Sequence, residues 1–315
     1  MNQVVLGVDI GGTNTVFGLI DNQGTISHLQ TIPTQGELPF SGFISRLISI
    51  VDQLLQSNPE TQLMGIGIGA PNGNHFSGLI QNPPNLSWGN VNIVQQLESH
   101  YNCPVQLSND ANCAAQGEKF FGHASEFSDF IMITLGTGLG SGIYSGGNLI
   151  YGNDGMAGEL GHLSIDANGR QCNCGLKGCL EMYVSAKGFV TTIKHFLKQY
   201  PEDEFLLSLE LESMNGKELD KAYDAGVKSA VDIYTYSGEK LGFGLAQAAT
   251  LFSPSAFIFY GGYSNAGSRL LSHAKKAMDS FLMNNLKQKI QLLPSGLPDG
   301  KAGILGAASM IWATQ

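Results

Sequence analysis

The sequence carries little charge, and the charge it has is not concentrated anywhere. Only 14% of the 315 residues are charged, where about 25% is typical of soluble domains. Acidic residues outnumber basic ones by 26 to 17, which gives a net charge of −9, and no run of lysine and arginine occurs. Because nucleic-acid-binding surfaces depend on such basic clusters to contact phosphates, we expect no nucleic-acid partner.

The chain also lacks a long apolar segment. No stretch approaches the ~18 uninterrupted apolar residues that a membrane-spanning helix requires. The first ten residues have neither the basic start nor the apolar run of a secretory signal. The sequence therefore predicts no membrane partner and a cytoplasmic location. Since 43% of the 315 residues are apolar, a large core is possible, and the length favours two domains.

Two common nucleotide-binding signatures are missing. The sequence contains no G-x-x-x-x-G-K-[ST] loop, which excludes a P-loop enzyme. Gly65, Gly67 and Ala70 match the loose G-x-G-x-x-G/A dinucleotide pattern, but Pro71-Asn72-Gly73 follows where that motif must open a helix. We interpret these glycines as parts of a closely packed strand and turn, and a dehydrogenase is disfavoured.

Glycine, by contrast, is abundant. It accounts for 41 of 315 residues, nearly twice the usual ~7%. Glycine-rich turns follow two apolar strands, at 11–12 and at 136–140, and each turn leads into a second strand. This repetition predicts a fold of two related halves, although two similar hairpins could also arise by chance. Helical periodicity predicts long helices over 185–200, 216–251 and 268–287.

The first of these turns has the composition of a phosphate site. Asp9, Gly11, Gly12 and Thr13 place a carboxylate, two glycines and a hydroxyl at the end of a strand. Glycine lets the backbone approach an anion closely and adopt positive φ. An ordinary hairpin turn is the alternative. The second turn, at 134–140, has the same character, and two such turns facing each other would clamp a polyphosphate.

Asn109 and Asp110 lie between a predicted strand, 104–107, and a predicted helix, 111–121. In α/β sheets the carboxyl ends of the strands face the ligand, so a carboxylate there is well placed to act as a general base. A helix N-cap would use the same residue types at the same place. Position alone leaves both interpretations open.

A third feature combines one histidine with closely spaced cysteines. His162 is followed ten residues later by Cys172, and Cys174 and Cys179 come next. Three thiolates and an imidazole make a complete tetrahedral zinc set with no open position, which is typical of a structural site. Three buried free cysteines beside a core histidine are the alternative. Cys103 and Cys113 have no such neighbours, and we expect them in the core.

These pieces together resemble one known family. The segments VDIGGTNT, GIGIGAPNG, NPPNLSW, LSNDANCAAQGE, ITLGTGLGSGI, AGELGH and CNCGLKGCLE occur in the order typical of the ROK family (repressor, open reading frame, kinase). The resemblance covers essentially the whole chain. It implies the two-lobed α/β fold of the actin-like, ribonuclease H-like ATPases, with a mixed sheet flanked by helices in each lobe and a ligand cleft between the lobes. The expected lobes are residues 1–120, completed by a C-terminal helix at 301–315, and residues 121–300, which carry the zinc loop.

The resemblance also implies an ATP-dependent sugar kinase that uses Mg²⁺ and contains a structural Zn²⁺. Its phosphate-binding positions correspond here to Asp9, Gly11, Gly12, Thr13, Thr137 and Gly138, with Asp9 also near the magnesium and Gly261 and Gly262 along the adenosine. Its hexose-binding positions correspond to Asn82, Asn109, Asp110, Glu159, His162 and Glu181. Asp110 would be the base that takes the proton from the sugar 6-hydroxyl, and His162 would contact both zinc and sugar.

The expected substrate is a hexose, with glucose first. N-acetylglucosamine, N-acetylmannosamine, mannose, fructose and allose remain alternatives, because Pro83-Pro84 departs from the spacing of many glucokinase-like relatives. A sugar-responsive repressor is disfavoured, since such family members carry an additional N-terminal DNA-binding domain. A sugar-binding protein without catalysis is disfavoured by Asp9, Asp110 and Glu159. The resemblance further implies a homodimer.

Overall fold

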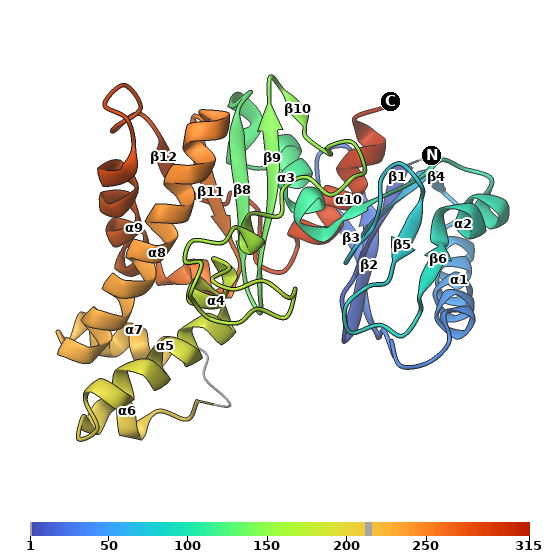
Figure 1. The fold of residues 1–315 in the computed structure, drawn as a ribbon. Coiled ribbons are helices and arrows are strands. Elements are labelled where there is room, and N and C mark those ends of the chain that lie inside the picture. The colour runs from blue at the N-terminus through green and yellow to red at the C-terminus, as the bar shows by residue number, and fades with distance from the viewer. Residues whose placement is uncertain (1, 212–215) are drawn as a thin grey trace.

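The computed structural model describes residues 2–211 and 216–315, which form two α/β lobes side by side (Figure 1). The strands of the first lobe are β1 (Asn2–Ile10), β2 (Asn14–Ile20), β3 (Ile26–Pro33), β4 (Thr61–Ala70), β7 (Val105–Asn109) and the small hairpin β5 (Leu79–Gln81) and β6 (Asn90–Asn92). Those of the second lobe are β8 (Phe130–Leu135), β9 (Leu139–Ser145), β10 (Asn148–Leu149), β11 (Ala256–Tyr260) and β12 (Gln291–Pro294).

The two main sheets repeat one topology. Their strand orders are β3-β2-β1-β4-β7 and β10-β9-β8-β11-β12. In each sheet the first three strands pair antiparallel and the last two join in parallel, so both sheets are mixed. The residue after β1 is Gly11, and the residue after β8 is Gly136. The predicted pair of related halves is therefore confirmed.

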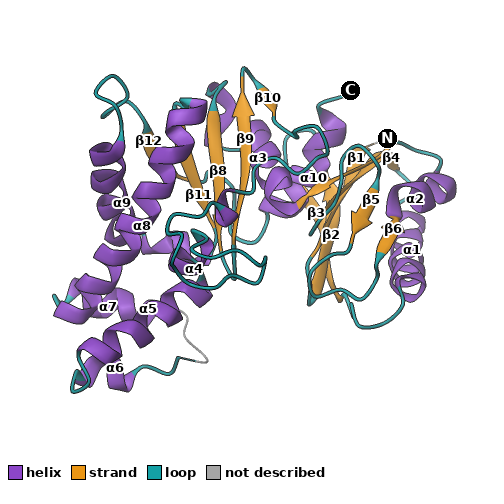
Figure 2. Cartoon of the chain, in the orientation of Figure 1, coloured by secondary structure: helices purple, strands orange, loops and turns teal. Residues whose placement is uncertain are grey.

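Helices flank these sheets and also extend beyond one end of the second sheet (Figure 2). They are α1 (Phe40–Gln56), α2 (Ile93–Tyr101), α3 (Asp110–Phe121), α4 (Glu181–Val184), α5 (Ala186–Gln199), α6 (Glu204–Ser208), α7 (Lys217–Asp224), α8 (Lys228–Phe252), α9 (Ser268–Phe281) and α10 (Ala302–Trp312), with single 3-10 turns at 123–126, 160–162 and 262–266. The apolar spacing of α1 explains its orientation, because Phe43, Leu47 and Val51 are all buried on one face. They join Leu6 and Val8 of β1 in the first core.

Two helices cross between the lobes. α3 follows the first sheet but packs against β8 and β9 of the second, while α10 follows the second sheet but packs against β1 and β4 of the first. The two helices also pack on each other, and Figure 1 shows them between the sheets. Val5 and Ile20 of the first lobe share a hydrophobic cluster with Phe130, Ile258 and Ile304. The lobes are thus joined through a common core.

Glycine makes this crossing possible. A β-carbon on Gly67 of β4 would overlap the carbonyl of Ala307, and one on Gly306 would overlap the carbonyl of Cys113. The expectation that Gly65 and Gly67 belong to a closely packed strand is therefore confirmed. Cys113 is fully buried, as expected, whereas Cys103 is only half-buried beside the first core.

The predicted helix over 216–251 is wrong in one respect. A turn at Ala225–Val227 divides it into α7 and α8. Gly226 in this turn has φ +75°, a conformation that ends a helix and that glycine adopts without steric cost. The periodicity of the flanking residues conceals the interruption. Within the part of the chain that is described, no helix combines the length and apolarity needed to span a membrane.

Candidate active site and metal site

The sheet topology brings three strand ends of the first lobe together. β1 ends beside β4, where Asp9 pairs with Gly69, and β4 ends beside β7, where Ala70 pairs with Asn109. Asp110 follows at once as the first residue of α3. Asp9 and Asp110 therefore stand at the same edge of the sheet, as the sequence predicts for residues that follow parallel strands.

The two carboxylates influence each other. Burial, reinforced by the negative charge of Asp110, raises the pKa of Asp9 to about 7. Burial also raises the pKa of Asp110, and the hydrogen bond from the Ala111 N–H opposes that rise. Protein atoms surround Asp110 on most sides, but part of its surface remains exposed to solvent. An accessible carboxylate whose pKa is raised above its ordinary value is a stronger base and is suited to accepting a proton from a substrate.

The structure assigns the N-cap role to Asn109, and the role of Asp110 as a general base stays a prediction. Asn109 is the N-cap of α3, and its side-chain oxygen accepts from Ala111 N at 2.8 Å. Asp110 is already in the first turn, and its Oδ1 also accepts from Ala111 N at 2.8 Å. The cap is therefore supplied by Asn109 and does not depend on Asp110. The backbone N–H of Ala111 orients Oδ1 of the Asp110 carboxylate, and Oδ2 is left available to contact a ligand.

The glycines of the first turn serve close approach and not positive φ, so that part of the expectation is wrong. Gly11 and Gly12 lie outside the left-handed region. The Gly11 N–H donates to Asn14 O at 2.9 Å, and a β-carbon on Gly11 would lie 2.9 Å from the same oxygen. Gly12 and Thr13 are exposed, with only Asn85 near Gly12. The tip of the turn is thus open to a ligand.

The second turn contacts Glu181, which lies two residues beyond Cys179. Glu181 Oε2 accepts from Leu139 N at 2.9 Å, and a β-carbon on Gly138 would overlap this carboxylate. Gly261, at φ +102°, lies so close that a β-carbon there would overlap Leu135 O. Gly262 has open space around its α-carbon. The structure therefore groups Gly138, Glu181 and Gly261 around the end of β8.

Glu159 connects the two halves of the site. Burial raises the pKa of Glu159; the nearby His162 opposes the rise, and Asp110 and Glu181 add to it. The Glu159 Oε2 lies 3.9 Å from His162 Nε2. Four of the six expected hexose-binding residues, Asp110, Glu159, His162 and Glu181, are thus near one another, and Asn109 adjoins them. Asn82 sits on the β5–β6 loop, where its N–H donates to Gly89 O at 3.1 Å.

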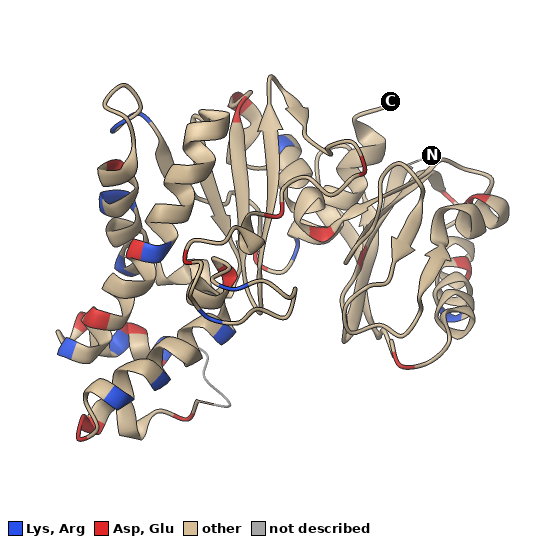
Figure 3. Cartoon of the chain, in the orientation of Figure 1, with Lys and Arg blue, Asp and Glu red and all other residues tan. Residues whose placement is uncertain are grey.

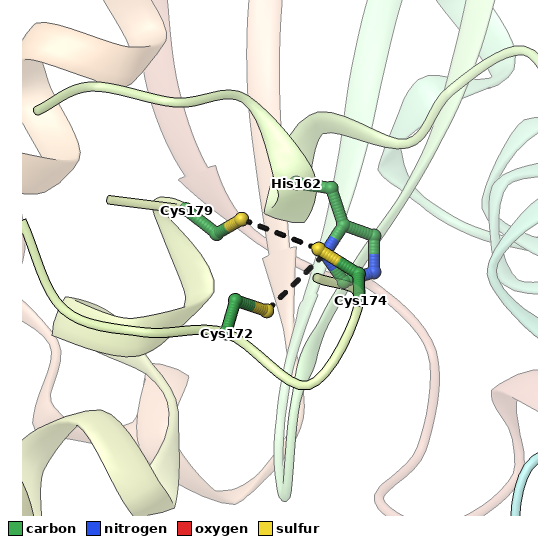
Figure 4. A group of neighbouring side chains, drawn as sticks. All are labelled: His162, Cys172, Cys174 and Cys179. Atoms are coloured by element: carbon green, nitrogen blue, oxygen red, sulfur yellow. Dashed lines mark hydrogen bonds between the residues drawn. The ribbon is translucent and has the colours of Figure 1, made fainter. Parts of the chain in front are cut away.

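The expected zinc ligands converge (Figure 4). One donor atom from each of His162, Cys172, Cys174 and Cys179 lies within 4.8 Å of the others. His162 Nδ1 is 3.7 Å from Cys172 Sγ, and Cys174 Sγ is 3.5 Å from Cys179 Sγ. Burial and the neighbouring thiols raise the pKa of Cys179 to about 12. A soft divalent cation fits this donor set, because it would bind the thiolates and remove their mutual repulsion.

His162 uses its two ring nitrogens on opposite sides. Nδ1 faces the cysteines, and Nε2 faces Glu159. A histidine that binds a metal through one nitrogen commonly donates through the other to a second group. The side-chain placement is therefore compatible with the predicted double use of His162.

Sequence reasoning missed two residues that shape the site. Arg170 holds the cysteine loop against α4 and α5, because Nη1 donates to Met182 O at 2.6 Å and to Gly188 O at 3.0 Å. Gly303, in the first turn of α10, lies so close to Asp9 that a β-carbon would overlap its carboxylate. No local sequence signal marks Arg170 or Gly303, because the residues that each contacts are distant from it along the chain.

Basic residues are unevenly distributed along the chain. Figure 3 shows most lysines and arginines on the helices of the second lobe. Arg46 is the only lysine or arginine in residues 1–118. Hollows of about 610 Å³ over α8 and α9 and about 450 Å³ beside β7 lie elsewhere. The site is therefore identified by its chemistry, which is four carboxylates beside two open backbone turns, and not by its volume.

Comparison with known proteins agrees with the motifs. The model of the ROK family matches residues 5–314. A glucokinase of Streptomyces coelicolor is 34% identical over 98% of this chain and 97% of its own. The crystal structure of a ROK family glucokinase from Streptomyces griseus, in complex with glucose and AMPPNP, is 34% identical, with a TM-score of 0.80 over 98% of both chains.

Repressors are among the relatives as well. The xylose repressor of Bacillus subtilis is 29% identical over 97% of this chain and 76% of its own length. The similarity of fold extends over both lobes, because the solved glucokinase aligns with 98% of this chain. The fold is the two-lobed actin-like ATPase fold, and the chain belongs to the ROK family.

Proposed function

We propose that this protein is an ATP-dependent sugar kinase that phosphorylates a hexose, with glucose as the first candidate, at its 6-hydroxyl. The observation that carries the proposal is Asp110, an accessible carboxylate of raised pKa at the strand ends. The glucokinase relatives, and the solved relative with glucose and an ATP analogue, support the choice of substrates. N-acetylglucosamine, N-acetylmannosamine, mannose, fructose and allose are the alternatives.

In this proposal Asp110 takes the proton as the 6-hydroxyl oxygen attacks the γ-phosphate. Hydrogen bonding to Ala111 N fixes one carboxylate oxygen, so the other can point at the hydroxyl. Glu159, Glu181, His162, Asn109 and Asn82 would bind the remaining hydroxyls. Phosphoryl transfer needs mainly alignment and neutralisation of charge.

The phosphates would be held by backbone groups at Gly11, Gly12, Thr13, Thr137 and Gly138, with Gly261 and Gly262 along the adenosine. Since the first 118 residues contain a single arginine, charge neutralisation falls to the Mg²⁺ that accompanies ATP. Asp9 is the carboxylate placed to meet it, and its raised pKa reflects the unfavourable burial that a cation would relieve.

We also propose that His162, Cys172, Cys174 and Cys179 bind a structural Zn²⁺. When bound, zinc would cross-link the loop between residues 162 and 179 and leave no position for a reacting group. The chemistry of the donor set carries this proposal. A homodimer remains a proposal that rests on the family resemblance, and sedimentation analysis would test it. A cytoplasmic location remains a proposal that rests on the sequence pattern.

The decisive experiment replaces Asp110 with asparagine. Loss of a general base commonly costs about 10²–10⁴-fold in rate, so we expect D110N to lose hexose phosphorylation while it still binds sugar. Coupled ADP release with a panel of hexoses and N-acetylhexosamines would measure the rate and select the substrate. Asp299→Asn, at an exposed position, is the matched control. A D110N enzyme with more than half of the wild-type turnover would overturn the assignment.

A sugar-binding regulator is the second candidate, because repressors are among the relatives. The same assay separates the two functions. A regulator would bind sugar without releasing ADP, whereas the kinase releases ADP in proportion to sugar phosphate.

A further inference from the structure

The turn after β4 contains an asparagine in an unusual conformation. Asn72 has φ +54°, in the left-handed region that residues other than glycine rarely occupy. It stands two residues beyond Ala70, which pairs with Asn109 next to Asp110. Asn72 is thus close to the strand ends that carry the site, although it has no role in the proposed mechanism.

The side chain of Asn72 binds the backbone of a different loop. Its Nδ2 donates to Gln81 O at 3.1 Å and to Asn82 O at 3.2 Å. The Gln81 N–H in turn donates to Asn72 O at 3.1 Å. Asn82 is itself left-handed, at φ +42°. Three hydrogen bonds between Asn72 and this loop therefore hold three consecutive peptide units, from 80–81 to 82–83, on both sides of the left-handed Asn82.

The loop that leaves Asn82 is fixed at its far end by other contacts. Trp88 and Leu86 are buried in the first core, and Trp88 Nε1 donates to Leu38 O at 3.2 Å. Between these two ends Asn85 lies over the first phosphate turn, with its β-carbon 3.4 Å from where a β-carbon on Gly12 would be. Asn72 is hydrogen-bonded to the near end of a loop that runs from Asn82, a proposed hexose-binding residue, to the tip of that turn.

We propose that Asn72 is a positioning residue for the hexose pocket, acting through the peptide units of Gln81 and Asn82. This inference rests on the proposed function, because it assumes that the 82–89 loop borders bound sugar. Two carbonyls need two N–H donors, and the primary amide of asparagine supplies both from one nitrogen. Aspartate would tolerate the left-handed backbone, but it would set a carboxylate against those carbonyls.

Substitution of Asn72 by glycine distinguishes the role of its side chain from the role of its backbone conformation. Glycine adopts positive φ without strain, so Asn72→Gly keeps the turn and removes only the two side-chain hydrogen bonds. Loss of these two hydrogen bonds leaves the peptide units around Asn82 less well positioned before the sugar binds, so we expect the KM for the hexose to rise about tenfold, equivalent to about 1.4 kcal/mol. We expect kcat to change by less than about twofold, because Asp110 is untouched. Asn72→Asp should raise KM at least as much.

The matched control is Asn102→Gly. Asn102 is also left-handed, at φ +50°, but it caps α2 and precedes the start of β7, whereas the site lies at the other end of that strand. Steady-state kinetics and melting temperature would be measured for all three variants and the wild type. An Asn72→Gly enzyme with an unchanged hexose KM overturns the inference, as does one that loses thermal stability without a change in KM.

The failure of this inference differs from the failure of the proposed function. If the wild type phosphorylates a hexose and Asn72→Gly behaves like it, only the role of Asn72 is wrong. If the wild type binds hexoses without turnover, calorimetric Kd replaces KM, and the same tenfold weakening is expected. If calorimetry detects no hexose binding to the wild type, both the proposed function and this inference are wrong.

Discussion

Asp9 is the residue at which the demands of folding and of chemistry differ most. Its carboxylate is half-buried at the end of β1, near Asp110 and close to the first turn of α10. Burial without a compensating cation disfavours the charged form, which is why its pKa rises to about 7. A site that neutralises phosphates with a metal ion must keep such a carboxylate despite its cost to stability.

This cost can be measured as a dependence of stability on pH. The pKa of Asp9 is about 7 in the folded chain, against 3.8 for an ordinary aspartate, so the folded state binds more protons than the unfolded state between these pH values. The free energy of unfolding in Mg²⁺-free buffer should therefore fall as the pH rises from about 4 to about 7. Asp9→Asn should remove this contribution, making the protein more stable than the wild type at pH 8 by on the order of 3 kcal/mol.

Urea unfolding at pH 4.5 and pH 8 would test this, with Asp299→Asn as the control. The gain should be confined to the higher pH, and hexose phosphorylation should be lost. A variant that is less stable than the wild type at pH 8 would contradict the explanation.

At this scale the sequence predicts residues that follow strands but not residues that act across the chain. Asp110 is predictable because parallel strand ends share one edge of a sheet. Asn72 is not, since its partners Gln81 and Asn82 lie in a hairpin whose position the sequence does not fix. The positive φ expected at Gly11 and Gly12 is absent because a tight approach of Asn14 O, and not a left-handed turn, is what excludes a side chain at Gly11.

Among the elements, the loop from His162 to Cys179 does the most to join separate parts of the site. It is held on one side by the four donor residues and on the other by Arg170, which stacks on Tyr183 at 4.5 Å. Cys179 is followed by Leu180 and then by Glu181, which contacts the second turn at Leu139 N. Displacement at the cysteines is therefore transmitted over two residues to a carboxylate of the site.

Cys174→Ser tests this connection. Loss of one thiolate should reduce bound zinc from about one per chain, raise the KM for the sugar, and lower the melting temperature by about 5 °C, equivalent to roughly 2 kcal/mol. Metal analysis, kinetics and calorimetry would measure the three effects. Cys103→Ser, outside the cluster, is the control. Unchanged KM together with full stability would refute the coupling between the loop and the sugar.

The elements themselves are largely predictable where a motif or a period marks them. The strand expected at 104–107 extends to Asn109, and the helix expected from 111 begins at Asp110. The single helix expected over 216–251 is not found, because only the φ of Gly226 reveals the turn there. The predicted glycine turns explain only part of the glycine content. Others, at positions such as Gly67, Gly117 and Gly306, allow backbones to pack closely.

At the scale of the whole molecule, the crossing of α3 and α10 determines how the lobes are joined. Gly117 and Gly306 face each other there, and a β-carbon on Gly117 would lie 2.8 Å from Gly306 N. Because α3 begins at Asp110, a shift at this crossing would displace the proposed base. The division of the chain at residue 120 stays a prediction.

Gly306→Ala should therefore damage stability and activity together. Overpacking of this kind costs about 1–3 kcal/mol, and kcat should fall more than the sugar KM changes. Gly42→Ala is the matched control, because Gly42 is exposed in α1 with only Arg46 near it. There alanine should stabilise by about 0.5–1 kcal/mol. Denaturant unfolding and kinetics would measure both, and equal behaviour of the two variants would contradict the role of the crossing.

The exchange of α3 and α10 also bears on how the chain matures during synthesis. The face of β1 and β4 that α10 covers is apolar, and Val5 there is fully buried in the finished protein. Ribosomes release the N-terminal part of a chain first, so this face stays uncovered until residues 302–312 have emerged. The first lobe is synthesised before the second lobe but is completed only after it, so a nascent chain of this protein should be a substrate for chaperones.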